Sequence, residues 1–492
     1  MENGKKYPLI LTIDEVRKIR STIGYDSLKL AGNVNIVEAG DLVIVPDAPR
    51  LILRPRKFLS TILMIRRKYG FKSLIYAQGI ADPYLLPSLV YAGVSVFDDL
   101  YPRMDALNGI AYGPLGKYAT ETDSTEQNLR FTGEIVGDLA RAISDGTLRE
   151  VVEKFVMSSK SSELLRILEK EYYAETEETF PARTPQIRAN LVDSLSRPDL
   201  VRYRDYVTNR YMKPQSKTVA LLIPCSARKP YSSSRSHRSL IERLGALRKF
   251  THEIIITSPV GVVPRELEET YPPRFYDVPV TGNWYEDEKV MIGNMLSTYF
   301  SRNRYDHIIA LVKEDLNFIS DFLPNGSDLI SGRIDRTEDL DKLVKKLDEF
   351  APQRPVSHDE RMERMSAIAR YQFGDWIGNY IENFRIIRSY NQYMFTENGE
   401  PRLVYNEPKG SFSIHKSFAG AFIKEGKFVV SIEDFKPTSN VYAIGVVDAT
   451  RDVRPEGEVV VSHSGEPRGT GIAKMPMEAM IQLEKGVAVK MR

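Results

Sequence analysis

The stretch from Thr218 to Leu240, TVALLIPCSARKPYSSSRSHRSL, contains the side chains best suited to chemistry in this chain of 492 residues. It begins as an apolar run and then places Cys225, the only cysteine of the sequence, close to Lys229. A cysteine near cations can be held partly as thiolate, which is a strong nucleophile at neutral pH. The same residue can equally be a small apolar side chain that ends a buried strand. The sequence leaves both interpretations open.

The polar residues after Cys225 could supply proton transfer and hydrogen bonds. His237 has an unperturbed pKa of about 6.5, which makes it the first candidate for moving protons near neutral pH. Tyr231, Ser234 and Lys229 could donate hydrogen bonds to a negative charge that develops during a reaction. A single histidine can also be purely structural, so its role depends on the elements that hold it.

The apolar runs around this stretch predict a doubly wound, mostly parallel sheet over residues 201–350. TVALLIPC, HEIIITSPVG and RYDHIIALV are short apolar runs that end in turn residues, which is typical of strands buried on both faces. The helical patterns SLIERLGALRKF and EKVMIGNMLSTYFSRN lie between them. In such sheets ligands bind at the carboxyl ends of the strands, where we expect both Cys225 and Ser258.

The remaining sequence divides into three further parts. Residues 1–200 alternate apolar runs with helical patterns: a strand at Ser73–Ile80, a helix that ends at Gly93, and mostly helices over Leu129–Tyr173. Residues 351–408 form an α+β connector, although Glu338–Tyr393 reads as mainly helical, with a break around Pro352–Pro355. Residues 409–492 carry short alternating strands separated by glycine turns, which predict a small all-β barrel. The chain is thus an α/β multidomain protein.

Composition excludes several classes. With 42% hydrophobic and 27% charged residues, the chain reads as an ordinary soluble globular protein. A lone cysteine fits a reducing cytoplasm and excludes a cysteine-based zinc site, and we expect no metal and no cofactor. We see no signal peptide and no membrane span, so the expected location is cytoplasmic. A net charge of +2 means that nucleic-acid binding needs local basic patches.

Three regions resemble families that modify tRNA. The central series PC-x3-KPY-x2-S-x2-H (Pro224, Cys225, Lys229, Pro230, Tyr231, Ser234, His237) is similar to the signature of the archaeosine synthases, and the segment Thr257–Trp284 also looks like their central domain. Tyr91–Arg103 resembles the segment of tRNA-guanine transglycosylases that carries the nucleophilic aspartate, with Asp98 in that place. The C-terminal strands, which end in KGVAVKMR, look like a PUA domain, an RNA-binding module.

The N-terminal region departs from the transglycosylases. Those enzymes hold a structural zinc with three cysteines and a histidine, which this chain lacks, and Ser95 stands where they have another aspartate. Two hundred residues are also short for a complete eight-fold barrel, which typically needs about 250. We therefore interpret residues 1–200 as a degenerate TIM-barrel-like domain in which Asp98 is a relict.

The resemblance implies a reaction and its participants. Archaeosine synthases convert the nitrile of 7-cyano-7-deazaguanine in the D-loop of tRNA to an amidine by adding an amine, with free lysine as the implied donor, although some relatives are described as using glutamine or ammonia. A radical SAM enzyme then splits the adduct to give archaeosine. The expected catalytic residues are Cys225, Lys229, Tyr231, Ser234 and His237. The expected substrate-binding residues are Ser258, Arg265, Asp277, Glu286 and Asp287, and the expected RNA-binding residues are Lys416, Lys424, Arg468, Lys474 and Lys490.

Three alternatives stay open. Glu286 and Asp287 could bind substrate ammonium groups or could simply form a solvated helix start. The chain could remain an active transglycosylase that exchanges guanine for the deazaguanine. It could also be a non-catalytic scaffold that binds tRNA for a partner enzyme.

Overall fold

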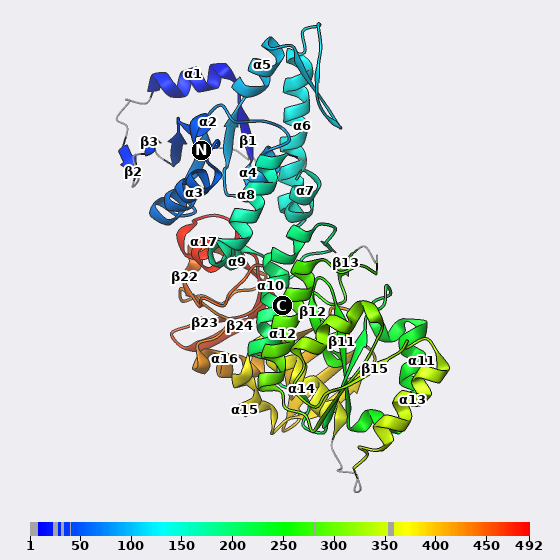
Figure 1. Cartoon of the computed structure of the whole chain (residues 1–492). Coiled ribbons are helices and arrows are strands. Elements are labelled where there is room, and N and C mark those ends of the chain that lie inside the picture. Colours follow the sequence, from blue (N-terminus) through cyan, green and yellow to red (C-terminus); the bar gives the residue numbers. More distant parts are fainter. Residues whose placement is uncertain are drawn as a thin grey trace. The chain divides into compact units, whose positions relative to one another are not determined.

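The structure is a computed structural model in which residues 8–22, 28–30, 34–39, 41–156, 158–278, 282–352 and 359–492 are described (Figure 1). The chain divides into two compact units. The first contains residues 1–185, 440–455 and 474–489, and the second contains residues 186–439, 456–473 and 490–492. The proline-broken stretch expected around Pro352–Pro355 lies largely outside the described residues.

The first unit is built on a six-stranded sheet with the order β1-β6-β5-β4-β3-β2. The strands are β1 (Leu9–Leu11), β2 (Leu28–Leu30), β3 (Val34–Ala39), β4 (Leu42–Val45), β5 (Leu74–Ala77) and β6 (Val96–Asp98). The run β4-β5-β6-β1 is parallel, whereas β3 pairs antiparallel with both β2 and β4. From β4 to β6 consecutive strands lie side by side with helices between them, as in a βα barrel, but the sheet is open, with β1 and β2 as its edges in the described part. The interpretation of this region as a degenerate TIM-barrel-like domain remains a prediction.

Helices cover this sheet and continue beyond it. The helix α3 (Pro55–Tyr69) buries Phe58, Ile62 and Ile65 at helical spacing against the core. The other helices before residue 186 are α1 (Ile13–Thr22), α2 (Ala48–Leu51), α4 (Leu86–Tyr91), α5 (Leu100–Leu107), α6 (Thr125–Ser144), α7 (Leu148–Lys154), α8 (Ser159–Lys170) and α9 (Tyr173–Thr179). The helical prediction for residues 129–173 is confirmed. No helix in the described ranges has both the length and the apolar character needed to cross a bilayer.

The second unit contains the predicted parallel sheet, with the order β12-β11-β10-β14-β15. Its strands are β10 (Val219–Pro224), β11 (Thr251–Thr257), β12 (Gly261–Pro264), β14 (His307–Val312) and β15 (Asp328–Ser331). All neighbours are parallel except the antiparallel edge pair β11–β12. The apolar strands are almost wholly buried, as a sheet covered on both faces requires. The doubly wound sheet is confirmed.

The direction of the connections places helices on both faces of this sheet. The chain passes from β10 through α11 (Arg235–Leu244) to β11, and then through α12 (Glu286–Arg302) to β14 on the other side of β10. Because both crossovers are expected to be right-handed, the reversal of direction puts the two helices on opposite faces. Figure 1 shows α11 beside α13 (Thr337–Asp348), with α12 apart from them. The chain therefore reverses direction at β10.

The connector and the C-terminal part differ from the expectation in two ways. The mainly helical prediction up to Tyr393 is wrong at its end, because α14 (Glu360–Phe373) and α15 (Gly378–Ile381) are followed by a four-stranded antiparallel sheet. Its strands are β16 (Arg385–Ser389), β17 (Gln392–Glu397), β18 (Glu400–Asn406) and β19 (Ser411–Ile414). The alternation of exposed and buried residues in β17 is a strand pattern that the sequence reading missed.

The C-terminal strands form a curled half-barrel rather than an all-β barrel. In the second unit β23 (Glu458–His463) pairs parallel with β20 (Val429–Ile432) and antiparallel with β24 (Glu466–Ala473). The prediction of strands alone is wrong because two helices interrupt them, α16 (Ala419–Glu425) and α17 (Met477–Gln482). Ala419 and Phe422 of α16 lie at i, i+3 spacing and are buried, so this apolar run folds as one helical face.

Candidate active site

Cys225 lies at the carboxyl end of the central strand β10. The parallel register pairs Pro224 with Ile256, and the backbone N–H of Cys225 donates a hydrogen bond to the Ile256 carbonyl over 3.2 Å. Thr257 and Ser258 follow Ile256, so the ends of the two strands bring them next to Cys225. The predicted proximity of Cys225 and Ser258 follows from this register.

The sheet reverses its direction of winding at this point. β11 lies on one side of β10 and β14 on the other, so the loops after β10 and β14 turn away from each other. Such a switch point is where doubly wound sheets bind ligands. The 3-10 helix after β14 (Glu314–Phe322) carries Asp315, whose charge acts on the Cys225 thiol. The site therefore gains an acidic residue that the sequence reading did not single out.

A chain of three hydroxyl groups, from Tyr231, Tyr276 and Thr257, runs to Cys225. The hydroxyls of Tyr231 and Tyr276 are 2.8 Å apart, and those of Tyr276 and Thr257 are 2.7 Å apart. Thr257 in turn hydrogen-bonds the Cys225 side chain. Burial raises the pKa of both tyrosines far above neutrality, so their hydroxyls remain protonated and can donate. We call these three residues the hydroxyl chain.

Cys225 and Lys229 influence each other electrostatically. Burial raises the pKa of the half-buried Cys225 thiol, although the Thr257 hydrogen bond and the positive charge of Lys229 oppose that shift. Burial lowers the pKa of Lys229, whose Nζ lies 3.9 Å from the centre of the Tyr276 ring. The thiol is therefore mostly protonated at neutral pH, whereas Lys229 gives up its proton more readily than a surface lysine does.

His237 does not fit the predicted role in proton transfer. It lies in the first turn of α11, and Ser234 caps that helix by accepting a hydrogen bond from the His237 backbone N–H. The imidazole is fully buried, its Nε2 is 3.1 Å from the Pro224 carbonyl, and its Nδ1 is 2.9 Å from Arg265. Burial, followed by the charge of Arg265, lowers its pKa to about 3. The prediction is wrong in its premise, because the imidazole is neutral at working pH and both nitrogens are engaged.

Arg265 is also occupied by the protein itself. Its Nε lies 2.8 Å from a Glu253 carboxylate oxygen and its Nη1 lies 2.9 Å from Glu268. The side chain is only 11% exposed. Instead of binding substrate, as expected, Arg265 holds His237, and His237 holds the Pro224 carbonyl one residue before Cys225.

The other predicted substrate-binding residues fall into two groups. The Ser258 hydroxyl oxygen is buried and has no hydrogen-bond partner within the described residues, while Asp277 ends β13 (Tyr276–Asp277), is exposed and acts electrostatically on Lys229. Ser258 follows the strand beside Cys225 and Asp277 acts on Lys229, so a role of both in binding substrate stays a prediction. Glu286 and Asp287 are exposed in the first turn of α12, and Glu286 lies 3.1 Å from Lys289. This arrangement favours the solvated helix start. Part of the loop before them, residues 279–281, lies outside the described residues.

The predicted RNA-binding side chains are mostly exposed. Lys416, Lys424, Lys474 and Lys490 are solvent-accessible. Arg468 differs, because its Nη2 lies 2.7 Å from Asp434. The carboxylate reduces the charge that this arginine can offer to phosphate.

Two family models match the chain. A domain of unknown function (DUF5591) matches residues 200–348, which contain the parallel sheet and the site at Cys225. The PUA domain matches residues 432–492.

Individual relatives match along most of the chain. The archaeosine synthase subunit alpha of Thermoplasma acidophilum is 48% identical over 93% of this chain and 89% of its own length. The archaeosine synthase subunit alpha of Methanosarcina acetivorans is 31% identical over 93% of this chain and 80% of its own length. The tRNA-guanine(15) transglycosylase of Methanocaldococcus jannaschii is a more distant relative, 24% identical over 77% of this chain and 54% of its own.

Proposed function

The chain belongs to the family of archaeosine synthase alpha subunits, and we propose that it adds an amine to the nitrile of 7-cyano-7-deazaguanine in the D-loop of tRNA. It is a tRNA-modifying enzyme of archaeosine biosynthesis with a C-terminal PUA domain. The finer proposal is that the amine is the side-chain amine of free lysine. A radical SAM enzyme that cleaves the lysine adduct completes the pathway in this proposal.

The reaction needs two proton movements, one to deprotonate the lysine ammonium and one to the nitrile nitrogen, and no oxidant or reductant. The lone pair of the lysine ε-nitrogen forms a bond to the nitrile carbon, and one π bond of the nitrile breaks toward its nitrogen. The incoming nitrogen loses a proton and the nitrile nitrogen gains one, which gives the amidine. Because the side chain of free lysine has a pKa of about 10.4, the site must first accept its extra proton. A base near the donor and a proton source near the nitrile nitrogen are therefore required.

One observation carries this proposal: Lys229, Cys225 and the hydroxyl chain meet at the switch point of the sheet. Because burial lowers its pKa, Lys229 is suited to take the proton of the incoming ammonium and to return it. The hydroxyl chain ends next to Cys225 at Thr257, whose hydroxyl donates to the Ser258 carbonyl over 3.2 Å. In this proposal that hydroxyl turns to the nitrile nitrogen and donates to it as negative charge develops there. The unpartnered Ser258 hydroxyl offers a second donor.

Cys225 lines the nitrile pocket and the addition proceeds directly in this proposal. A thioimidate mechanism, in which the Cys225 sulfur attacks the nitrile carbon and lysine later displaces it, needs a thiolate. The raised pKa of the Cys225 thiol and the neutral state of His237 both reduce the thiolate fraction. A direct attack by lysine needs only that the nitrile be polarised, and the hydroxyl chain can polarise it by donating a hydrogen bond to its nitrogen.

The lysine substrate needs carboxylates to hold its ammonium group. Asp277 and Asp315 are exposed, and they act electrostatically on Lys229 and on Cys225 respectively. Glu286 lies 3.1 Å from Lys289 instead. We therefore assign the donor-binding role to Asp277 and Asp315 rather than to the start of α12.

The active-transglycosylase alternative requires an accessible Asp98, and the surroundings of this residue argue against it. Asp98 is fully buried, and its Oδ2 accepts hydrogen bonds from the Tyr76 hydroxyl over 2.8 Å and from the Gly79 N–H over 2.9 Å. Its Oδ1 accepts a third bond from the Leu100 N–H over 3.1 Å. A carboxylate held in this way serves to join the ends of the strands rather than to attack a ribose.

A mass measurement separates the remaining functions. The purified protein is incubated with free lysine and tRNA that carries the nitrile base. A mass increase of the base by one added lysine supports the synthase, whereas release of the base supports a transglycosylase. Unchanged tRNA that still binds the protein supports the scaffold and contradicts the proposal. Glutamine and ammonium as donors in parallel reactions test the choice of lysine.

A further inference from the structure

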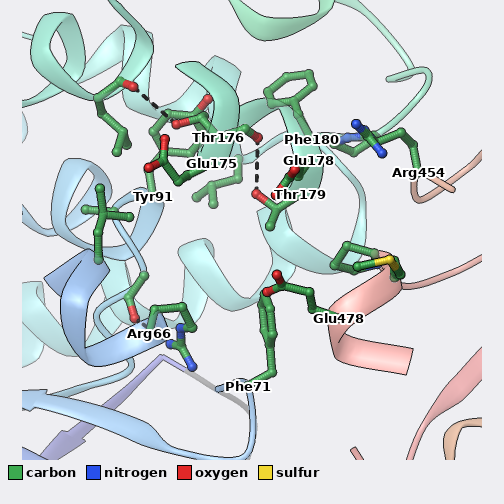
Figure 2. Close-up of a pocket in the computed structure, with 18 of the residues that line it drawn as sticks. Arg66, Phe71, Tyr91, Glu175, Thr176, Glu178, Thr179, Phe180, Arg454 and Glu478 are labelled. Atoms are coloured by element: carbon green, nitrogen blue, oxygen red, sulfur yellow. Dashed lines mark hydrogen bonds between the residues drawn. The ribbon is translucent and has the colours of Figure 1, made fainter. Parts of the chain in front are cut away.

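A cavity of about 540 Å³ lies within the first unit and shares no residue with the site at Cys225, which belongs to the second unit (Figure 2). Its walls come from α3, α4, the helices α6 to α9, and the C-terminal segments that carry Arg454 and α17. The size is within the usual range for small-molecule sites, and the walls combine apolar side chains with a few charged ones, as such sites commonly do. None of its residues has a role in the function proposed above.

Most arginines that line the cavity are neutralised by a carboxylate. Arg149 is bound through Nε and Nη2 to Glu169, at 2.6 and 3.0 Å, and Arg454 lies 2.7 Å from Glu177. Arg67 is paired with Glu175. A carboxylate thus compensates the charge of these three arginines, and the pairing is two-pronged for Arg149 and Arg454.

Arg66 and the exposed Arg451 have no carboxylate partner within the described residues, and of these two Arg66 is the one that the protein holds in place. Its guanidinium donates to three backbone carbonyls, through Nη1 to Gly70 and Ser73 at 2.8 and 2.9 Å and through Nη2 to Gly93 at 3.2 Å. These bonds hold the group in place but carry no counter-charge. Burial lowers the pKa of Arg66, and no carboxylate offsets that shift. Arginine has five N–H donors, so Nε–H and one N–H of Nη2 remain for a further acceptor.

Two acidic side chains at the cavity are similarly without a cationic partner in the described structure. Glu178 is the second-last residue of α9, Glu478 lies in the first turn of α17, and both are exposed. Figure 2 shows Glu178 and Arg66 on opposite sides of the opening. The Phe71 ring lies 5.2 Å from the Arg66 guanidinium carbon. The cavity thus offers one held cation, two carboxylates and apolar surface between them.

We propose that this cavity is a binding site for a free amino acid or a similar small zwitterion, with its carboxylate on Arg66 and its ammonium facing Glu178 and Glu478. A planar carboxylate matches the remaining donors of a guanidinium. Inorganic phosphate offers the same anionic oxygens, but a dianion would face repulsion from the two glutamates. The site is separate from the donor site at Asp277 and Asp315, and the proposal does not rest on lysine transfer.

Binding is tested by isothermal titration calorimetry of the full-length chain with three probes: lysine, norleucine and inorganic phosphate. The titrations use the Asp277→Asn/Asp315→Asn background, which removes the proposed donor site and leaves the cavity unchanged. Saturable binding of lysine or norleucine in this background supports the proposal. If neither amino acid binds up to millimolar concentration, or if phosphate alone binds, the assignment is overturned.

Three variants locate the binding. Arg66→Lys keeps the positive charge but loses the planar fork, and we expect about tenfold weaker binding, as for the loss of a hydrogen bond to a charged group. Because Arg66 also holds three carbonyls, the Glu178→Gln/Glu478→Gln variant gives an independent test on exposed residues and should weaken binding by a similar factor. Arg56→Gln is the matched control, since Arg56 lies on the same helix and pairs with Glu171 outside the cavity. Equal affinity in the Arg66 and glutamate variants would place the ligand elsewhere and overturn the proposal.

Discussion

Arg265 lies 2.9 Å from Nδ1 of His237, and this contact determines what the histidine can do. Because an arginine can only donate, Nδ1 must be the accepting nitrogen and Nε2 carries the hydrogen that is given to the Pro224 carbonyl. The tautomer is thereby fixed, and the charged form of the imidazole would face a buried guanidinium. His237 acts as a positioning residue for the end of β10 in this arrangement.

The first prediction concerns the stability of the protein at mildly acidic pH. The pKa of His237 is about 3 in the folded chain, against an ordinary value of 6.5, so the unfolded chain binds the extra proton between these values. The neutral imidazole therefore stabilises the fold fully above pH 6.5, and this contribution is lost as the pH falls toward 3. We expect His237→Gln to be less stable than the wild type at pH 7 and to approach it at pH 5. Urea midpoints at the two pH values measure this, and a constant difference would contradict the assignment.

The second prediction concerns Lys229 as the group that moves protons. Lys229→Arg keeps the positive charge, but guanidinium does not give up a proton, so lysine transfer should fall by about a hundredfold or more, the lower range for acid–base catalysis. Binding of the nitrile-bearing tRNA should change little. Single-turnover rates and tRNA affinity measured together separate the two effects. Lys249→Arg, at an exposed position of the same domain, serves as the control.

The sequence was informative where the physical pattern is local. Strands β10, β11 and β14 are continuous apolar runs that alternate with helical patterns. This alternation correctly predicts the parallel sheet and the position of Cys225 at the end of a strand. Of the hydroxyl chain only Tyr231 was predicted, because the chain is formed by tertiary contacts. Tyr276 is 45 residues from Tyr231 in sequence and 19 residues from Thr257. Asp315 could have been found, since the switch-point rule also applies to the residues after β14.

The sequence was misleading where burial changes the chemistry. The ordinary pKa of histidine suggests a catalytic role for His237. However, His237, Leu240 and Leu244 follow the spacing i, i+3, i+7 in α11 and lie on its buried face. The helical spacing of these three residues was a signal that His237 points into the core. Arg265 was likewise expected to bind substrate, whereas the two glutamates that neutralise it lie within 12 residues of it in sequence.

The third prediction concerns the reactivity of Cys225. Because burial raises the pKa of the thiol, iodoacetamide should modify the folded protein at pH 8 more slowly than the urea-unfolded protein. The absence of any other cysteine makes the modification unambiguous by intact mass. Cys225→Ala should retain most lysine transfer if the addition is direct. Loss of transfer in Cys225→Ser with tRNA binding intact, together with a denaturation-stable protein–tRNA adduct formed without lysine, would instead support the thioimidate mechanism.

The last prediction concerns the binding of tRNA by the PUA domain and by the segment just before it, since Lys416 and Lys424 lie outside the matched residues 432–492. Removing the domain is a poor test, because its residues contribute to both compact units, 440–455 to the first and 456–473 to the second. Substitution of exposed side chains instead leaves the fold in place. Lys416, Lys424 and Lys490 are exposed and therefore suitable for substitution. Arg468 is left out because it is already paired with Asp434.

Replacing these three lysines by glutamine should weaken tRNA binding and also its dependence on salt. Each phosphate contact contributes roughly 0.7 to 0.9 to the slope of log affinity against log salt, so the slope should decrease by about 2 if the three lysines contact the backbone. Filter binding at several potassium chloride concentrations gives both quantities. The control exchanges three exposed lysines of the central domain, Lys249, Lys342 and Lys345, for glutamine, which produces the same change in net charge. An equal decrease in both triple variants would show that attraction depends on total charge, and the assignment of the RNA-binding face to these three lysines would be wrong.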